Sequence, residues 1–239
     1  MRLYKVEQKL FFRSADVFIF NLCMPVVALL LIAMIAGNKS AGGNITYLQS
    51  AFAALSSVGI CCSAFMSIPI LMVDYRDKKV LKSFYCSPCS PATLLGADTL
   101  CSAVMCGISA LLVALVAIIG FGYRMEGSVI AFIGSWLLTL VSMFSIGLLV
   151  ASLCRTVKSM NVATSLLYFP MLLFSGATIP YEVFPKGMQK IADFMPLSQG
   201  IQLMKAVSAG TEVSITGIVV LAVIAVLCTG IAVKTFRWE

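Results

Sequence analysis

The chain has 239 residues, of which 60% are hydrophobic and only 11% charged, and its mean hydropathy is +1.01. This composition excludes a water-soluble globular domain, which needs a polar surface, and indicates a membrane protein. The formal net charge of +7 is explained by basic residues in the loops of a membrane protein, so it does not indicate a nucleic-acid-binding surface.

The first 14 residues, MRLYKVEQKLFFRS, are predicted to form an amphipathic interfacial helix at the cytoplasmic membrane surface. Four basic residues cluster on one face of such a helix, and apolar residues lie broadly opposite. The alternative is that residues 1–14 are only a charged flank that anchors the first span.

Six charge-free runs follow, and each reaches the roughly 20 residues that a helix needs to cross a membrane. They lack the period-two alternation of barrel strands, so their backbone hydrogen bonds must close within helices. We therefore predict an all-α, polytopic membrane protein that forms a single domain over residues 1–239. The predicted transmembrane helices cover residues 17–36, 49–73, 94–121, 128–151, 161–178 and 213–233.

Six spans place both termini on the same side of the membrane, and the basic residues select that side. Twelve of the 17 Lys and Arg residues flank the spans on the side of the termini, against five on the other side. The positive-inside rule therefore predicts cytoplasmic termini. We expect a location in the plasma (inner) membrane of a bacterium.

The longest predicted cytoplasmic loop covers residues 74–98. Asp77 can cap a short helix, and Ser90 with Pro91 can start the helix that becomes the third span. The apolar stripe of the short helix would consist of Val80, Leu81, Phe84 and Tyr85. A rigid knob of this kind either docks a partner or packs against its own helical bundle.

The same loop contains Cys86 and Cys89 at redox spacing. The pattern lacks a preceding strand, and a chain without histidine is short of zinc ligands, so we assign no metal site. None of the nine cysteines falls in a predicted outer loop, so no disulfide framework is indicated.

Residues 179–212, between the fifth and sixth spans, carry six charges. A full span with these charges would cost on the order of 15–20 kcal/mol, so the segment is not predicted to cross the bilayer. It nevertheless keeps apolar residues at helical intervals, interrupted by Pro185 and Pro196. We predict short re-entrant helices that dip into the outer leaflet and are buried in protein.

Several kinds of chemistry are missing from the sequence. There is no histidine, and the spans carry charge only near their ends, which argues against an ion-coupled carrier or an intramembrane hydrolase. No phosphate-binding P-loop motif is present. We therefore expect a non-enzymatic chain that binds no cofactor, and any energy for active transport must come from another polypeptide.

With this layout, the sequence resembles the membrane subunit of ATP-binding cassette (ABC) exporters of the ABC-2 permease type. The resemblance lies in the six spans with an N-terminal interfacial helix, in the loop sequence LKSFYCSPCSPATLLGAD, and in FSGATIPYEVFPKGMQKIADFMPLSQGIQLMK. It covers nearly the whole chain. One departure is the stretch Asp77 to Leu81, where the family commonly has Glu and Gly before a Thr-Leu pair.

The resemblance implies a coupling segment, within residues 74–92, that docks on a separate ATPase subunit. Its residues are Asp74, Arg76, Asp77, Val80, Leu81, Phe84, Tyr85, Ser87, Pro88 and Ser90. It also implies an outer gate that includes Phe174, Gly176, Pro180, Pro185 and Pro196. Two permease copies, as a homodimer or as a heterodimer with a sister permease, would assemble with two ATPases that bind ATP and Mg.

The substrate path is expected along the second and fifth spans, as in relatives, with one polar residue from the first. The candidate residues are Asn21, Phe52, Phe65, Met66, Tyr168, Phe169 and Met171. Met and aromatic side chains adapt to varied apolar cargo, although such residues are also ordinary core or lipid-facing positions.

These features predict a permease that exports an amphipathic small molecule, antibiotic or peptide with ATP hydrolysed by a partner. A lipid or glycan exporter is the alternative within transport. From another class, a non-transporting immunity or sensor subunit that sequesters a membrane-active peptide fits the same composition. Dependence on an ATPase partner separates the transport functions from the last one.

Overall fold

The structure is a computed structural model that describes residues 19–36, 40–42, 45–77, 91–154, 156–176, 181, 184–211 and 213–235. Within these residues the regular elements are helices, apart from two short antiparallel strands, β1 (Ser40–Gly42) and β2 (Ile45–Thr46). The predicted interfacial helix over residues 1–14 lies outside the described residues.

In its described residues, the first half of the chain forms three apolar helical stretches, each of which includes a π-helical segment. The first consists of η1 (Ile19–Cys23) and α3 (Met24–Ala36), and the second of α4 (Tyr47–Cys62), η2 (Ser63–Ser67) and α5 (Ile68–Asp77). The third consists of α7 (Pro91–Leu115) and η3 (Val116–Gly120).

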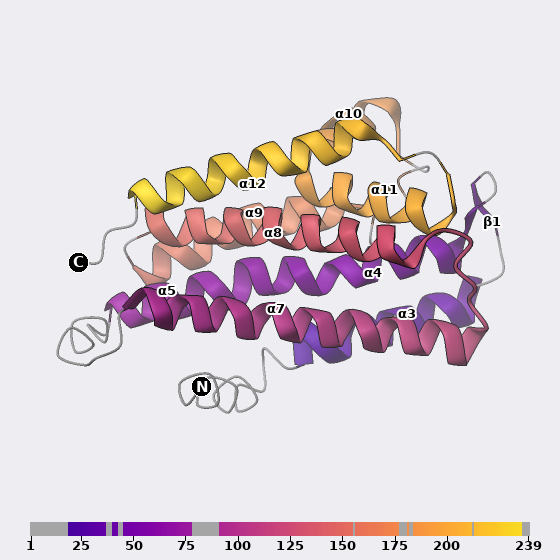
Figure 1. Cartoon of the computed structure of the whole chain (residues 1–239), viewed down its shortest axis with the longest axis horizontal. Helices are drawn as coiled ribbons and strands as arrows, with labels where there is room; N and C mark the ends of the chain where they lie inside the picture. Colours follow the sequence, from indigo (N-terminus) through magenta and orange to yellow (C-terminus); the bar gives the residue numbers. More distant parts are fainter. Residues whose placement is uncertain are drawn as a thin grey trace.

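Five helices lie in the described residues of the second half. Two of them, α8 (Val129–Leu153) and α9 (Val157–Phe174), precede the charged segment, and α12 (Ile215–Thr235) follows it. The charged segment itself forms α10 (Lys186–Phe194) and α11 (Pro196–Ser208). Figure 1 shows α4, α7, α8 and α12 running along the long axis, with α10 and α11 in the half of the molecule that contains β1.

Five helices in the described residues are long and apolar enough to cross a membrane. They are Tyr47–Tyr75, Gly96–Gly120, Val129–Leu153, Val157–Phe174 and Ile215–Thr235. The first predicted span appears as a shorter apolar helix, Asn21–Ile35. The five long helices correspond to the second to sixth spans expected from the sequence.

The continuous helix Tyr47–Tyr75 is the centre of the bundle. In its most apolar 18-residue stretch, 83% of the residues are buried, whereas the corresponding value for α7 is 28% and for α12 is 22%. Serine and alanine at many of its positions let neighbouring helices approach closely, as is common for packing within membranes. The other helices therefore surround this one.

Polar contacts join this central helix to its neighbours. The Trp136 indole N–H of α8 donates to the Ser56 carbonyl (3.1 Å), and the Cys106 thiol of α7 donates to the Gly59 carbonyl (3.5 Å). A separate contact between the Ser145 and Thr229 hydroxyls (2.9 Å) joins α8 to α12. Because lipid offers no competing hydrogen bonds, such pairs help to set which helices are neighbours.

Helix α8 approaches the central helix closely at Gly147. A Cβ at this position would overlap the backbone carbonyl of Ala64 in η2, whereas a Cβ at Gly134, on the same helix, would meet nothing within 4 Å. We expect Gly147→Ala to destabilise the protein by about 1–3 kcal/mol, because backbone atoms must shift to accept the methyl group. Thermal unfolding in detergent measures this loss, with Gly134→Ala as the matched control. Equal melting temperatures for the two variants would contradict the close packing described here.

Candidate functional site

The outward face of α9 carries an open groove with a volume of about 600 Å³. Its lining residues are Asn161, Val162, Ser165, Leu166, Phe169 and Pro170. They recur at intervals of four along the helix, so they form one continuous face. Leu166 and Phe169 are 73% and 58% exposed, so the groove is accessible from outside the helical bundle.

Local sequence explains how α9 starts and why its groove has a polar element. Thr156 caps the helix by accepting a hydrogen bond from the Ser159 backbone N–H (3.2 Å), and the Ser159 side chain completes the capping box. Pro170 lies inside the helix. Since proline has no N–H, the Leu166 carbonyl loses its usual helical donor and is left as an acceptor beside the groove.

The chemistry of the groove is apolar with two neutral polar groups. None of the six lining residues is ionisable, and the polar side chains are those of Asn161 and Ser165. Such a surface can contact an amphipathic guest by dispersion and by hydrogen bonds, but it offers no ion pair. Among the described residues, no group of three or more His, Cys, Asp or Glu side chains could hold a metal ion.

The structure divides the seven predicted path residues into two sets. Met66, in η2, and Phe169, in α9, are exposed at 38% and 58%. The others are buried inside the helical bundle: Asn21, Phe52, Phe65, Tyr168 and Met171. Tyr168 lies on the inward face of α9, where its hydroxyl is 3.3 Å from the Cys62 thiol.

Phe52 belongs to an aromatic cluster near the end of the central helix that follows β2. Its ring centroid lies 4.9 Å from that of Tyr123 and 5.2 Å from that of Phe132. Burial raises the pKa of the Tyr123 phenol, with Ser208 opposing the shift and the nearby Glu126 adding to it. The phenol is therefore neutral at pH 7, as its apolar surroundings require.

The described residues of the predicted outer gate lie around the point where α9 ends and α10 and α11 begin. Phe174 is the last residue of α9. Gly176, two residues later, has a φ of 78°, a backbone conformation that favours glycine. Pro185 precedes α10 and Pro196 is the first residue of α11. Pro180 lies outside the described residues.

Helix α11 is a buried element of this region. Most of its residues are buried, and it packs against α8, α4 and α12. The Ser198 hydroxyl at its start donates to the Phe174 carbonyl (2.9 Å), and the Ser57 hydroxyl of α4 contacts the Met204 sulfur (3.9 Å). The start of α11 is thereby fixed to the end of α9.

The end of α11 is held by the connection between η3 and α8. The backbone N–H groups of Glu126 and Gly127 both donate to the Ser208 carbonyl, at 3.2 and 3.4 Å. A Cβ at Gly127 would overlap the Val207 carbonyl, so only glycine allows this approach. We call residues 126–127 with 207–208 the outer strap.

Most of the predicted coupling residues lie outside the described part of the chain. These are Val80, Leu81, Phe84, Tyr85, Ser87, Pro88 and Ser90. Asp74, Arg76 and Asp77 lie in the last turns of α5, and α7 begins at Pro91. The described structure therefore contains the two helices that flank the predicted coupling loop.

Comparison with known proteins identifies the family. The model of the family described as ABC-2 type transporter matches residues 1–208. This chain belongs to the ABC-2 type transporter family. A curated relative is the daunorubicin resistance ABC transporter permease protein DrrB1 of Streptomyces coeruleorubidus, which is 25% identical over 192 residues, covering 79% of this chain and 67% of the relative.

Membership in the ABC-2 family, together with the apolar helices, makes the chain a multi-pass membrane component of an ABC transporter. ABC-2 permeases are the transmembrane components of these transporters rather than their ATPases, so the family implies a partner ATPase subunit.

Of the six groove residues, only Phe169 was predicted as part of the path, and five were missed: Asn161, Val162, Ser165, Leu166 and Pro170. Sequence reasoning searched the fifth span for Met and aromatic residues and therefore selected Tyr168 and Met171, which face inward. The available signal was the pair of polar residues one helical turn apart, Asn161 and Ser165, in a span that otherwise faces lipid or protein.

Proposed function

We propose that this chain is the permease subunit of an ABC exporter that moves an amphipathic small molecule, antibiotic or peptide outward. The energy comes from ATP hydrolysed on a separate subunit, and the permease itself is not an enzyme and binds no cofactor. ATP and Mg belong to the partner ATPases.

The observation that carries the choice of cargo is the uncharged groove on α9. Val162, Leu166 and Phe169 suit an apolar surface, and Asn161 and Ser165 suit neutral polar groups on the same guest. A curated relative named for daunorubicin resistance supports a drug-like cargo. A highly charged polysaccharide would find no compensating charge on this face.

The proposed architecture has six spans, with η1 and α3 forming the first although its described apolar part is short. Helices α10 and α11 are re-entrant in this proposal. Lys186 and Lys190 of α10 are exposed, while α11 is buried between longer helices, as expected for a segment that dips into the outer leaflet without crossing it. The excess of basic residues on the side of the termini supports a cytoplasmic location for both ends.

Transport would follow from closure of two ATPases on ATP. Their movement would displace the coupling segment within residues 74–92. It would also change the position of α5, which is the last part of the central helix. The buried path residues, including Phe65 and Tyr168, would then contact cargo only when the protomers rearrange. Phe174, Pro185 and Pro196 would act at the outer gate, where α11 moves relative to α9.

Purification of the chain from its native membrane in mild detergent, with mass spectrometry and an ATPase assay, tests this function. We expect a Walker-motif ATPase at a ratio near one to one, and hydrolysis that changes when amphipathic drugs or peptides are added. Stimulation by lipids or glycans instead would favour the alternative exporters. Recovery of the permease with no ATPase would refute the transport function and favour an immunity or sensor role.

A further inference from the structure

Helix α10 exposes large apolar side chains on the outside of the bundle. Met188, Ile191 and Phe194 recur every three residues and therefore lie along one edge of the helix, and Phe194 is 88% exposed. Ala192 is completely buried, so it marks the side of the helix that faces the bundle. Because water is an unfavourable neighbour for exposed apolar surface, this edge needs an apolar environment.

A basic edge adjoins the apolar edge of α10. Lys186 and Lys190 are exposed and one helical turn apart, and Phe194 lies one turn after Lys190. The one acidic residue of this helix, Asp193, accepts a hydrogen bond from the Tyr181 hydroxyl (2.8 Å). The helix therefore presents two positive charges beside its apolar edge, and its single carboxylate already has a hydrogen-bond donor.

This arrangement is typical of a helix that lies in the plane of a membrane interface. Such helices bury an apolar edge among the upper parts of the acyl chains and keep Lys or Arg beside the headgroups. With nine residues, α10 is about 14 Å long, whereas the hydrocarbon core is about 30 Å thick. Helix α10 therefore fits within one leaflet and cannot cross the membrane.

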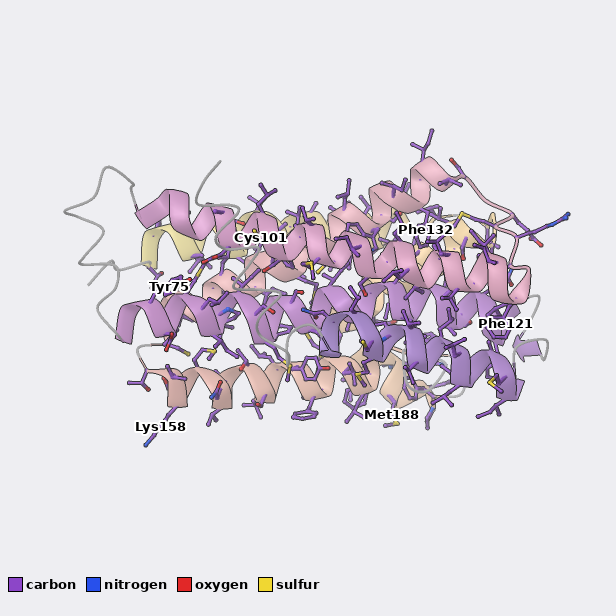
Figure 2. All side chains as sticks on the ribbon, turned by 90° about the horizontal axis from the view of Figure 1, so that it is seen from below. Tyr75, Cys101, Phe121, Phe132, Lys158 and Met188 are labelled. Carbon is purple, nitrogen blue, oxygen red and sulfur yellow. The ribbon has the colours of Figure 1, made fainter. Side chains whose placement is uncertain are left out.

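The exposed apolar surface of the membrane helices continues onto α10. This helix packs against α9, and Leu173, in the last turn of α9, is exposed. Figure 2 shows Met188, in α10, and Lys158, near the start of α9, along one edge of the structure. A bilayer around α9 therefore reaches the apolar edge of α10 as well.

We propose that α10 lies at the surface of the outer leaflet and binds anionic phospholipid there. Ile191 and Phe194 insert among the acyl chains, and Lys186 and Lys190 contact the headgroup phosphates. Phosphatidylglycerol suits this site better than phosphatidylcholine, in which a cationic group compensates the charge of the phosphate. The inference rests on the proposed function for the side of the membrane, because that function places α10 beside the outer gate.

Hydrogen bonds connect this lipid site to α11. The Gln199 side-chain amide, in the first turn of α11, donates to the Asp193 carbonyl of α10 (2.8 Å). The Ser198 hydroxyl donates in turn to the Phe174 carbonyl at the end of α9. A lipid that holds α10 in place therefore also restricts the start of α11, so the lipid composition of the leaflet acts on the proposed outer gate.

Fluorescence quenching by nitroxide-labelled lipids tests the contact. Gly187→Cys, which carries a bimane label, is introduced into the full chain after Cys23, Cys86, Cys89 and Cys228 have been replaced by serine. A Cβ at Gly187 meets nothing within 4 Å, and the remaining described cysteines are buried. In phosphatidylcholine vesicles, we expect nitroxide-labelled phosphatidylglycerol to quench the label at least about fivefold more efficiently than nitroxide-labelled phosphatidylcholine at the same mole fraction.

Substitution of the lysines tests whether their charge causes the preference. Lys186→Gln with Lys190→Gln should lower the quenching ratio to about one, whereas Lys186→Arg with Lys190→Arg keeps both charges and should preserve it. Lys158→Gln is the matched control, because Lys158 is an exposed lysine near the start of α9, away from α10. Equal quenching by the two lipids before any lysine is replaced, or an unchanged ratio in the glutamine variant of α10, would overturn the proposal.

A water-soluble quencher separates the bilayer from other occupants of this surface. Strong quenching by iodide with none by either lipid would place α10 in water. Protection from iodide and from both lipids would place a protein over the helix, either a second copy or another partner. Both results would overturn the proposal. The vesicles contain no ATPase, so either result would leave the proposed transport function standing, whereas failure to recover an ATPase from the native membrane would reject that function separately.

Discussion

Replacing Leu81 and Phe84 by aspartate is expected to abolish transport while the permease still inserts into the membrane. Both residues belong to the apolar stripe of the predicted coupling helix. Carboxylates on this stripe would have to be desolvated when the helix packs against the ATPase, which is unfavourable. We expect transport to fall by more than about tenfold, which corresponds to about 1.4 kcal/mol or more of lost interaction.

Transport into inverted vesicles and the amount of co-purified ATPase measure this effect. Ser83→Asp is the matched control, because Ser83 lies off the apolar stripe of the predicted helix but receives the same charge. Wild-type transport by the Leu81 and Phe84 double variant would show that residues 74–92 are not the coupling segment.

Gly127→Ala is expected to release the outer strap. The methyl group would overlap the Val207 carbonyl, so the connection before α8 must move away and lose both hydrogen bonds to the Ser208 carbonyl. The overlap and the lost bonds together should lower the stability by about 1–3 kcal/mol. In the proposed exporter, α11 would then move independently of the connection before α8. We therefore expect ATP hydrolysis to continue in the absence of cargo.

Hydrogen exchange at residues 205–211 and basal ATPase activity in proteoliposomes report on this release. Gly120→Ala is the control, since a Cβ at Gly120 meets nothing within 4 Å. We expect faster exchange and raised basal hydrolysis only in the Gly127 variant. If exchange in this segment stayed at the wild-type rate, the strap would not hold α11.

The long helices could be predicted closely because charges end the apolar runs in the sequence. The helix expected at 161–178 is the instructive exception, since α9 covers Val157–Phe174. Its start is set by the Thr156 and Ser159 capping box, which carries the helix past Lys158, and its end by the positive φ of Gly176. A search for uncharged runs detects neither a capping interaction nor a backbone angle.

The candidate site was less predictable because the composition of a span does not tell which of its faces points out of the helical bundle. Tyr168 and Phe169 are adjacent and both aromatic, yet the first contacts Cys62 in the core and the second lines the groove. Phe65 and Phe52 suited a path by residue type, but the central helix is enclosed by its neighbours. Only the tertiary packing separates these cases.

The π-helical segment η2 sets a rotational relation between the two halves of the central helix. Each residue of an α-helix turns the chain by about 100°, and a π-helical turn contains one residue more than an α-helical turn. Deleting one residue between Ser63 and Ser67 would therefore convert this segment to a regular α-helix, while α5, with Asp74 and the approach to the coupling loop, kept nearly the same orientation relative to α4. When sequences of this family are aligned, a permease with a regular α-helix here would require a one-residue gap at this point, even though its span had the same hydropathy.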